Sequence, residues 1–79
     1  MTEQQRVEMA KAQAWINEGK PCFKIYGFRW KGASPFPITT EEATTLFQSG
    51  LYTFGMNYNE LRWTDEGLMF CQYSEADML

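Results

Sequence analysis

The chain has 79 residues, 44% hydrophobic and 16% aromatic, which predicts one small domain over residues 1–79 and excludes disorder as the main state. A domain of this size has a small net stability, and a strained, enclosed active site would reduce that stability further. The length therefore favours a binding function over catalysis. A formal net charge of −3 disfavours a protein that wraps non-specifically around nucleic acid, although residues 1–34 carry +3 and residues 35–79 carry −6.

Residues 3–18 are predicted to form a helix. Thr2 followed three positions later by Gln5 is typical of a capping box, and Gly19 and Pro21 end the helix. At about 100° per residue its apolar residues fall on two narrow, nearly opposite faces. One face carries Val7, Ala10 and Ala14, and the other carries Met9, Ala12 and Ile16. The outer of these faces can serve self-association or simply tolerate water.

Residues 22–31 are rich in aromatic side chains, and we expect them to form the longest strand. Alternation along a strand divides the side chains between two faces. One face holds Phe23, Ile25 and Gly27, and the other holds Lys24, Tyr26, Phe28 and Trp30. A bulge at Gly27 would exchange the two faces beyond it, so the register stays open.

A loop over residues 32–37 leads to a second predicted helix at residues 40–49. Thr39 is its expected cap, with Glu42 three positions further on, and Gly50 ends it. Leu51 is expected to pack back on Leu46, as in a Schellman ending. The buried face of this helix is expected to hold Ala43, Leu46 and Phe47.

The remaining segment gives mixed signals before it closes with a hairpin. Over residues 51–59, alternating aromatic residues favour a strand, but Gly55 and two asparagines favour turns, so the type is left open. Residues 60–64 and 68–73 are predicted to pair as a β-hairpin, with Gly67 in a left-handed conformation. Residues 74–79 are expected to be a frayed tail.

The order of these elements predicts an α+β fold. We expect a small three- to four-stranded antiparallel sheet with two helices packed on one face. The opposite face of the sheet would then stay available for contacts.

Signatures of catalysis and metal binding are missing from the sequence. With two cysteines and no histidine, the chain lacks the usual zinc ligands and any Ser–His or Cys–His pair. Cys22 and Cys71 are expected to be small buried hydrophobes, the alternative being a disulfide or redox pair. Two carboxylate pairs, at positions 41–42 and 65–66, are explained by a helix start and a turn. We therefore expect no enzyme, no metal and no cofactor.

The strongest candidate contact surface is the strand at residues 22–31, extended by the hairpin if its first strand lies alongside. Its ring faces and cations suit a partner's side chains or nucleic-acid bases. The candidate contact residues are Lys24, Tyr26, Phe28, Trp30, Arg62 and Trp63. The plainer interpretation is that these rings belong to the core and the cations to a solvated edge.

From this surface we expect a non-enzymatic interaction module, of the kind that bacterial or phage accessory proteins provide. It would dock on another protein, or on its own copy through the first helix. The alternative function is single-stranded nucleic-acid binding through residues 22–31.

The acidic second half offers another candidate surface, for a basic partner or for imitation of a phosphate backbone, provided that its carboxylates converge. These carboxylates are Glu41, Glu42, Glu60, Asp65, Glu66, Glu75 and Asp77. Because the start of the chain is polar and no apolar run could span a bilayer, we expect a cytoplasmic protein with reduced thiols and no membrane contact.

Overall fold

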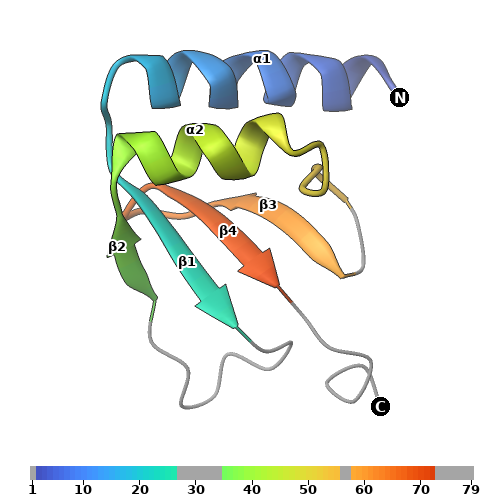
Figure 1. The fold of residues 1–79 in the computed structure, drawn as a ribbon. Coiled ribbons are helices and arrows are strands. Elements are labelled where there is room, and N and C mark those ends of the chain that lie inside the picture. The colour runs from blue at the N-terminus through green and yellow to red at the C-terminus, as the bar shows by residue number, and fades with distance from the viewer. Residues whose placement is uncertain (1, 27–34, 56–57, 73–79) are drawn as a thin grey trace.

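The computed structural model describes residues 2–26, 35–55 and 58–72. The elements of this part are α1 (Glu3–Asn17), β1 (Cys22–Tyr26), β2 (Phe36–Ile38), α2 (Thr40–Gln48), β3 (Asn59–Trp63) and β4 (Leu68–Gln72). Both helices lie on the same side of a four-stranded sheet, as Figure 1 shows. The predicted α+β class, with the helices on one face, is therefore confirmed.

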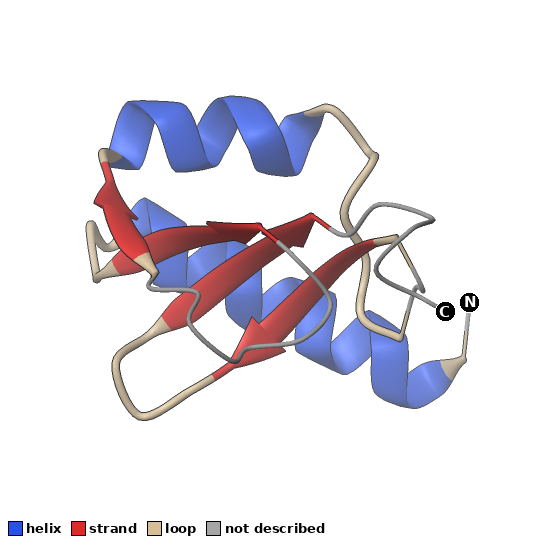
Figure 2. Ribbon diagram, turned by 90° about the horizontal axis from the view of Figure 1, so that it is seen from below, coloured by secondary structure: helices blue, strands red, loops and turns tan. Residues whose placement is uncertain are grey.

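The sheet is mixed, which corrects the purely antiparallel sheet expected from the sequence. Its strand order is β2-β1-β4-β3, and Figure 2 shows α1 crossing behind these strands. β1 pairs antiparallel with β2 but parallel with β4, whereas β3 and β4 form the predicted antiparallel hairpin. The parallel pairing runs from Cys22 opposite Leu68 to Tyr26 opposite Gln72. At its start, the N–H of Leu68 donates to the carbonyl of Pro21 at 3.3 Å.

Gly67 makes this alignment sterically possible. Its φ is +150°, the positive value predicted for the turn. A Cβ at this position would lie 2.4 Å from the carbonyl oxygen of Pro21, closer than any side chain tolerates. The hairpin can therefore approach the start of β1 only because residue 67 has no side chain.

The predicted capping box of α1 is present. The Thr2 hydroxyl accepts a hydrogen bond from the backbone N–H of Gln5 at 3.1 Å, and the Gln5 side chain accepts from the N–H of Thr2 at 2.9 Å. The two predicted faces are also observed. Ala12 and Ile16 are buried, Met9 packs on the core, and Val7 is 49% exposed on the outer side.

The second helix starts as predicted, and Gly50 with its φ of +76° ends it as expected, but the contact made by the next residue differs. The Thr39 hydroxyl accepts from the N–H of Glu42 at 3.0 Å. The expected packing of Leu51 on Leu46 is wrong, since Leu51 is 63% exposed. Its N–H donates instead to the hydroxyl of Ser49, which itself donates to the Leu46 carbonyl. This serine side chain replaces one of the two backbone bonds of a Schellman ending, whereas the other, from the N–H of Gly50 to the Phe47 carbonyl, is present at 3.4 Å.

The main core lies between the helices and the sheet. It joins both helices to three strands and to Tyr52, whose ring centroid lies 5.3 Å from that of Phe70. Tyr52 belongs to the segment whose type the sequence leaves open. Among its described residues, that segment forms an isolated parallel bridge from Thr53 to Glu60, and its last residue, Asn59, begins β3.

A smaller cluster of buried side chains lies on the sheet face opposite the helices. It contains Ile25, Met69 and Cys71, with Phe23 packed against them. Cys22 belongs to the helix-side core, so the two cysteines face opposite sides of the sheet and no disulfide joins them. Phe23 and Ile25 thus share a face, as predicted, while residues 27–31 of the expected longer strand and the tail at 74–79 lie outside the described residues.

Candidate functional site

The predicted contact residues do not form one surface. Lys24 and Tyr26 lie on β1 and Trp63 on β3, but β4 separates these strands, so the expected extension of the surface across neighbouring strands is wrong. Trp63 also lies at the end of the sheet where β1 begins, whereas Tyr26 lies where β1 ends.

Arg62 is separated from Trp63 by the alternation of the strand. It faces the side of the sheet away from the helices, where its side chain lies 3.5 Å from that of Glu60. Phe28 and Trp30 lie outside the described residues. The structure thus separates the described contact residues into Lys24 and Tyr26 on β1, Trp63 on the helix side of β3, and Arg62 on the opposite face of the sheet.

The first region is an exposed pair of rings on β1 and β2. Tyr26 is 50% exposed and Phe36 44%, with ring centroids 6.0 Å apart. The ammonium of Lys24 lies 5.2 Å from the centroid of Tyr26 and 4.0 Å from a carboxylate oxygen of Glu42. The Tyr26 side chain raises the pKa of Lys24, so this lysine stays charged. We call this region the Tyr26–Phe36 patch.

The second region is a row of three partly buried rings brought together from three separate segments. Trp15 comes from α1, Trp63 from β3 and Phe54 from the connection between α2 and β3. The rings of Trp15 and Trp63 meet edge to face with centroids 5.3 Å apart, and those of Trp63 and Phe54 stack at 6.2 Å. We call these three rings the aromatic row.

Both tryptophans of the row are held in place by hydrogen bonds within the protein. The indole N–H of Trp15 donates to the Pro21 carbonyl at 2.6 Å, and that of Trp63 donates to a Glu8 carboxylate oxygen at 2.6 Å. Because both polar atoms already have partners, the exposed parts of these rings offer apolar surface and π-faces to a ligand.

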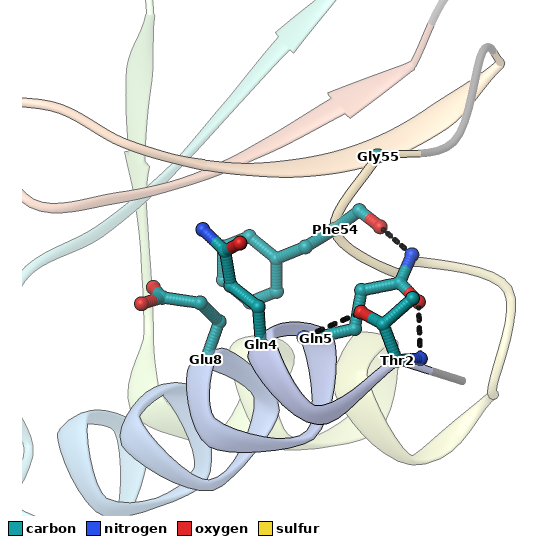
Figure 3. A pocket seen from close by; sticks show the side chains of 6 residues that line it. All are labelled: Thr2, Gln4, Gln5, Glu8, Phe54 and Gly55. Carbon is teal, nitrogen blue, oxygen red and sulfur yellow. Dashed lines mark hydrogen bonds between the residues drawn. The ribbon is translucent and has the colours of Figure 1, made fainter.

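Two open hollows follow the aromatic row along α1. The first has a volume of about 410 Å³ and is lined by Thr2, Gln4, Gln5, Glu8, Phe54 and Gly55. In Figure 3 the Gln5 amide is directed at the Phe54 carbonyl, to which it donates at 2.9 Å. The second hollow has a volume of about 300 Å³ and is lined by Lys11, Ala14, Trp15, Glu18, Lys20 and Trp63. We call the row and both hollows the α1 groove.

Lysine ammonium groups already lie over the two indole rings. Lys20 Nζ is 5.0 Å from the centroid of Trp15, and Lys11 Nζ is 5.4 Å from that of Trp63. Each lysine also lies near a carboxylate of α1, with Lys20 3.5 Å from Glu18 and Lys11 3.8 Å from Glu8. The groove thus combines ring faces, carboxylates and cations in one place.

Sequence reasoning identified Trp63 of this groove but missed Trp15 and Phe54 as its partners. One local signal was available, because Lys11 and Trp15 are four positions apart and so share a face of the helix. The contact between Trp15 and Trp63 depends on the tertiary fold, which no local pattern encodes.

The described carboxylates of the second half are divided between regions. Glu42 pairs with Lys24, while Glu60 pairs with Arg62 on the other face of the sheet. Thr64 accepts from the N–H of Glu66 in the hairpin turn. The convergence needed to imitate a phosphate backbone is therefore not met by these residues, whereas Glu75 and Asp77 lie outside the described part.

Within residues 2–26, 35–55 and 58–72, no three His, Cys, Asp or Glu side chains come close enough together to hold a metal ion. Neither α1 nor α2 has the length and apolar character needed to cross a membrane, as judged over these same residues. Comparisons with protein-family models, with curated proteins and with solved structures found no match.

Proposed function

We propose that this chain is a non-enzymatic interaction module that binds another protein through the α1 groove. The observation that supports this proposal most directly is the aromatic row, whose two tryptophan rings are oriented by hydrogen bonds and border an open hollow. Aromatic side chains fixed in this way lose little conformational entropy when a partner binds, which is why Trp and Tyr are frequent in the centres of interfaces.

Self-association through the outer face of α1 is the nearest competing arrangement. Val7, Ala10 and Ala14 are exposed there, and Ala14 also lines the second hollow. Two substitutions on one helix can therefore separate the two arrangements. Ala14→Tyr fills the second hollow, whereas Ala10→Tyr adds the same side chain to the outer face only.

The test combines capture of partners from an extract of the source organism's cells by the immobilised protein with light scattering of the free protein. We expect the wild type to retain a protein that Ala14→Tyr loses and Ala10→Tyr keeps, with both variants folded by circular dichroism. Equal capture by the two variants, or a strict monomer that captures nothing, would contradict the proposal. A dimer lost in both variants would indicate self-association instead.

Single-stranded nucleic-acid binding through β1 stays the alternative function. The Tyr26–Phe36 patch provides two exposed rings with the cation of Lys24 beside them. Oligothymidylate at low salt tests this alternative, because stacking and phosphate contacts would give salt-dependent binding that Tyr26→Ala weakens.

A further inference from the structure

The wall of the second hollow carries more positive than negative charge. Three of the described residues that line it are charged, namely Lys11, Lys20 and Glu18. Two ammonium groups therefore face one carboxylate in this hollow. The first hollow has the opposite sign, because Glu8 is the single charged residue among the described residues that line it. A negatively charged group is thus favoured in the second hollow over the first.

The ion pairs of the two lysines leave N–H donors for a further acceptor. Lys20 Nζ lies 3.5 Å from Glu18. Lys11 Nζ lies 3.8 Å from Glu8, which is longer than a hydrogen bond, and the other oxygen of Glu8 accepts the indole N–H of Trp63, so Glu8 compensates this lysine only in part. The side chain of Lys11 is 61% exposed and that of Lys20 is 48% exposed. Because an ammonium group has three N–H donors, each lysine can bind a carboxylate of its own chain and one of a partner.

The rest of the wall is apolar and suits the stem of an acidic side chain. Ala14 and the rings of Trp15 and Trp63 line the hollow beside the charged groups. A free inorganic anion would leave this surface in contact with water, whereas the methylene groups of a glutamate or aspartate side chain would cover part of it. The lining therefore favours an acidic side chain of a protein over a free anion.

We propose that the protein bound in the α1 groove presents an acidic segment, with a glutamate or aspartate side chain that enters the second hollow. The inference rests on the proposed function and adds the chemistry of the partner. The entering carboxylate accepts hydrogen bonds from the ammonium groups of Lys11 and Lys20, and its stem packs on Ala14. Glu18 repels this carboxylate and so limits the affinity.

Three substitutions in the hollow distinguish an acidic ligand from a basic one. Lys11→Gln and Lys20→Gln each remove one ammonium group, and each is expected to weaken binding about threefold, the effect of one exposed ion pair. Glu18→Gln removes the repelling carboxylate and is expected to tighten binding about twofold. For a basic ligand, all three effects would have the opposite sign.

The probe is a short capped peptide that alternates glutamate with alanine, and the matched probes carry glutamine or arginine in place of glutamate. Binding is followed by tryptophan fluorescence and by the indole N–H resonances of the full-length protein, at low and at high salt. Lys24→Gln is the control variant, because it changes the net charge equally at a lysine that also lies over an aromatic ring but belongs to the Tyr26–Phe36 patch. We expect the glutamate peptide to bind most tightly and to be released by salt, with Lys24→Gln leaving its affinity unchanged.

Tighter binding of the arginine peptide, or equal binding of the glutamate and glutamine peptides, overturns the inference. Equal losses of affinity in Lys20→Gln and Lys24→Gln also overturn it, because the net charge of the protein rather than the hollow would then govern binding. Oligothymidylate that shifts the Trp15 and Trp63 resonances, and does so no longer in Lys20→Gln, would assign the hollow to nucleic-acid phosphate instead.

The outcome for the partner's chemistry is separable from that for the proposed function. If no peptide binds while Ala14→Tyr still abolishes capture from extract, the acidic partner is wrong and the proposed function stands. If Ala14→Tyr has no effect on capture either, both are wrong.

Discussion

The α1 groove and the Tyr26–Phe36 patch both contain aromatic rings near a lysine, but they differ in how the rings are held. Trp15 and Trp63 are partly buried and hydrogen-bonded through their indole N–H groups, whereas Tyr26 and Phe36 are about half exposed. Phe36 lies on an edge strand of three residues whose centre is Pro37, a residue that blocks further strand pairing.

The surface proposed for partner binding is therefore the one whose rings are less exposed and more firmly held. Of the more exposed rings, Phe36 lies on an edge strand that resists strand addition and Tyr26 lies at the end of the neighbouring β1. The less exposed rings border the hollows and are oriented in advance. Substitutions that disturb one region and spare the other test this difference in how the rings are held. The largest loss of stability is expected at Gly67, whose backbone lies against Pro21 next to the groove.

Gly67→Ala should destabilise the protein by about 3 kcal/mol, because the new Cβ collides with the Pro21 carbonyl in addition to the strain of a positive φ. That same carbonyl accepts the indole N–H of Trp15, so the groove should be perturbed more than the Tyr26–Phe36 patch. Urea unfolding measures the first effect, and chemical shifts of the two regions measure the second.

Gly50→Ala is the matched control for this change. Gly50 has a φ of +76°, but nothing lies within 4 Å of the position of its Cβ. Only backbone strain remains, and the expected loss is about 1 kcal/mol. Equal losses of unfolding free energy in the two variants would mean that the close approach of Gly67 to Pro21 does not add to the cost of the Gly67→Ala change.

Trp63→Phe should cost about 2 kcal/mol, since it removes the hydrogen bond to the Glu8 carboxylate and reduces ring contact with Trp15. In the other region, Phe36→Leu should cost less than about 1 kcal/mol because Phe36 is 44% exposed. Thermal unfolding of the two variants checks this order, and a reversed order would refute the claim that the groove rings are the more firmly held.

Thr2→Ala and Thr39→Ala each remove a helix cap and should each cost about 1 kcal/mol. Only the first should affect the groove, because Gln5 of the same capping box also donates to the Phe54 carbonyl. We therefore expect weaker partner binding for Thr2→Ala and unchanged binding for Thr39→Ala at equal stability. If both variants lost partner binding equally, the first hollow would have no specific role in recognition.

The smallest effect concerns alkaline pH and the surroundings of Lys24. Burial raises the pKa of Tyr52 above its ordinary value of 10.0, and the Tyr26 side chain raises the pKa of Lys24 above 10.5. The folded protein holds these protons more tightly than the unfolded chain. The stability they contribute is present below about pH 10 and is lost as the pH rises through the folded-state pKa values.

The measurement is the free energy of unfolding at a series of alkaline pH values. The free energy of unfolding of Tyr52→Phe should fall less steeply above about pH 10 than that of the wild type, because one of the groups that lose protons is missing. An identical slope for both proteins would show that Tyr52 does not contribute to the alkaline loss of stability.

Local chemistry predicts much of this fold. Both helix caps, both faces of α1 and the β3–β4 hairpin follow from residues close together in the sequence. The parallel pairing of β1 with β4 does not, because it joins residues 22–26 to residues 68–72, which lie far apart in the sequence. The contacts at the end of α2 are likewise not predicted by the position of Gly50 alone. The Ser49 hydroxyl bonds to both the Leu46 carbonyl and the Leu51 N–H, so a side chain takes the place of a direct backbone bond.

The candidate site was less predictable than the fold. The sequence indicates Trp63 as a contact residue because of its aromatic ring and its basic neighbour. It also groups Arg62 with Trp63, although alternation along a strand places adjacent side chains on opposite faces of the sheet. The aromatic row joins three segments that are far apart in the sequence, and such a site exists only after the sheet has formed.

The strand order also determines when the protein can fold during its synthesis. β1 is made early and β4 late, yet they are neighbours at the centre of the sheet. A nascent chain that has not yet released residues 68–72 from the ribosome has only the three-residue β2 to pair with β1. We therefore expect the sheet to form only after residues 68–72 have left the ribosome, at a rate limited by closure of the long loop between the two central strands.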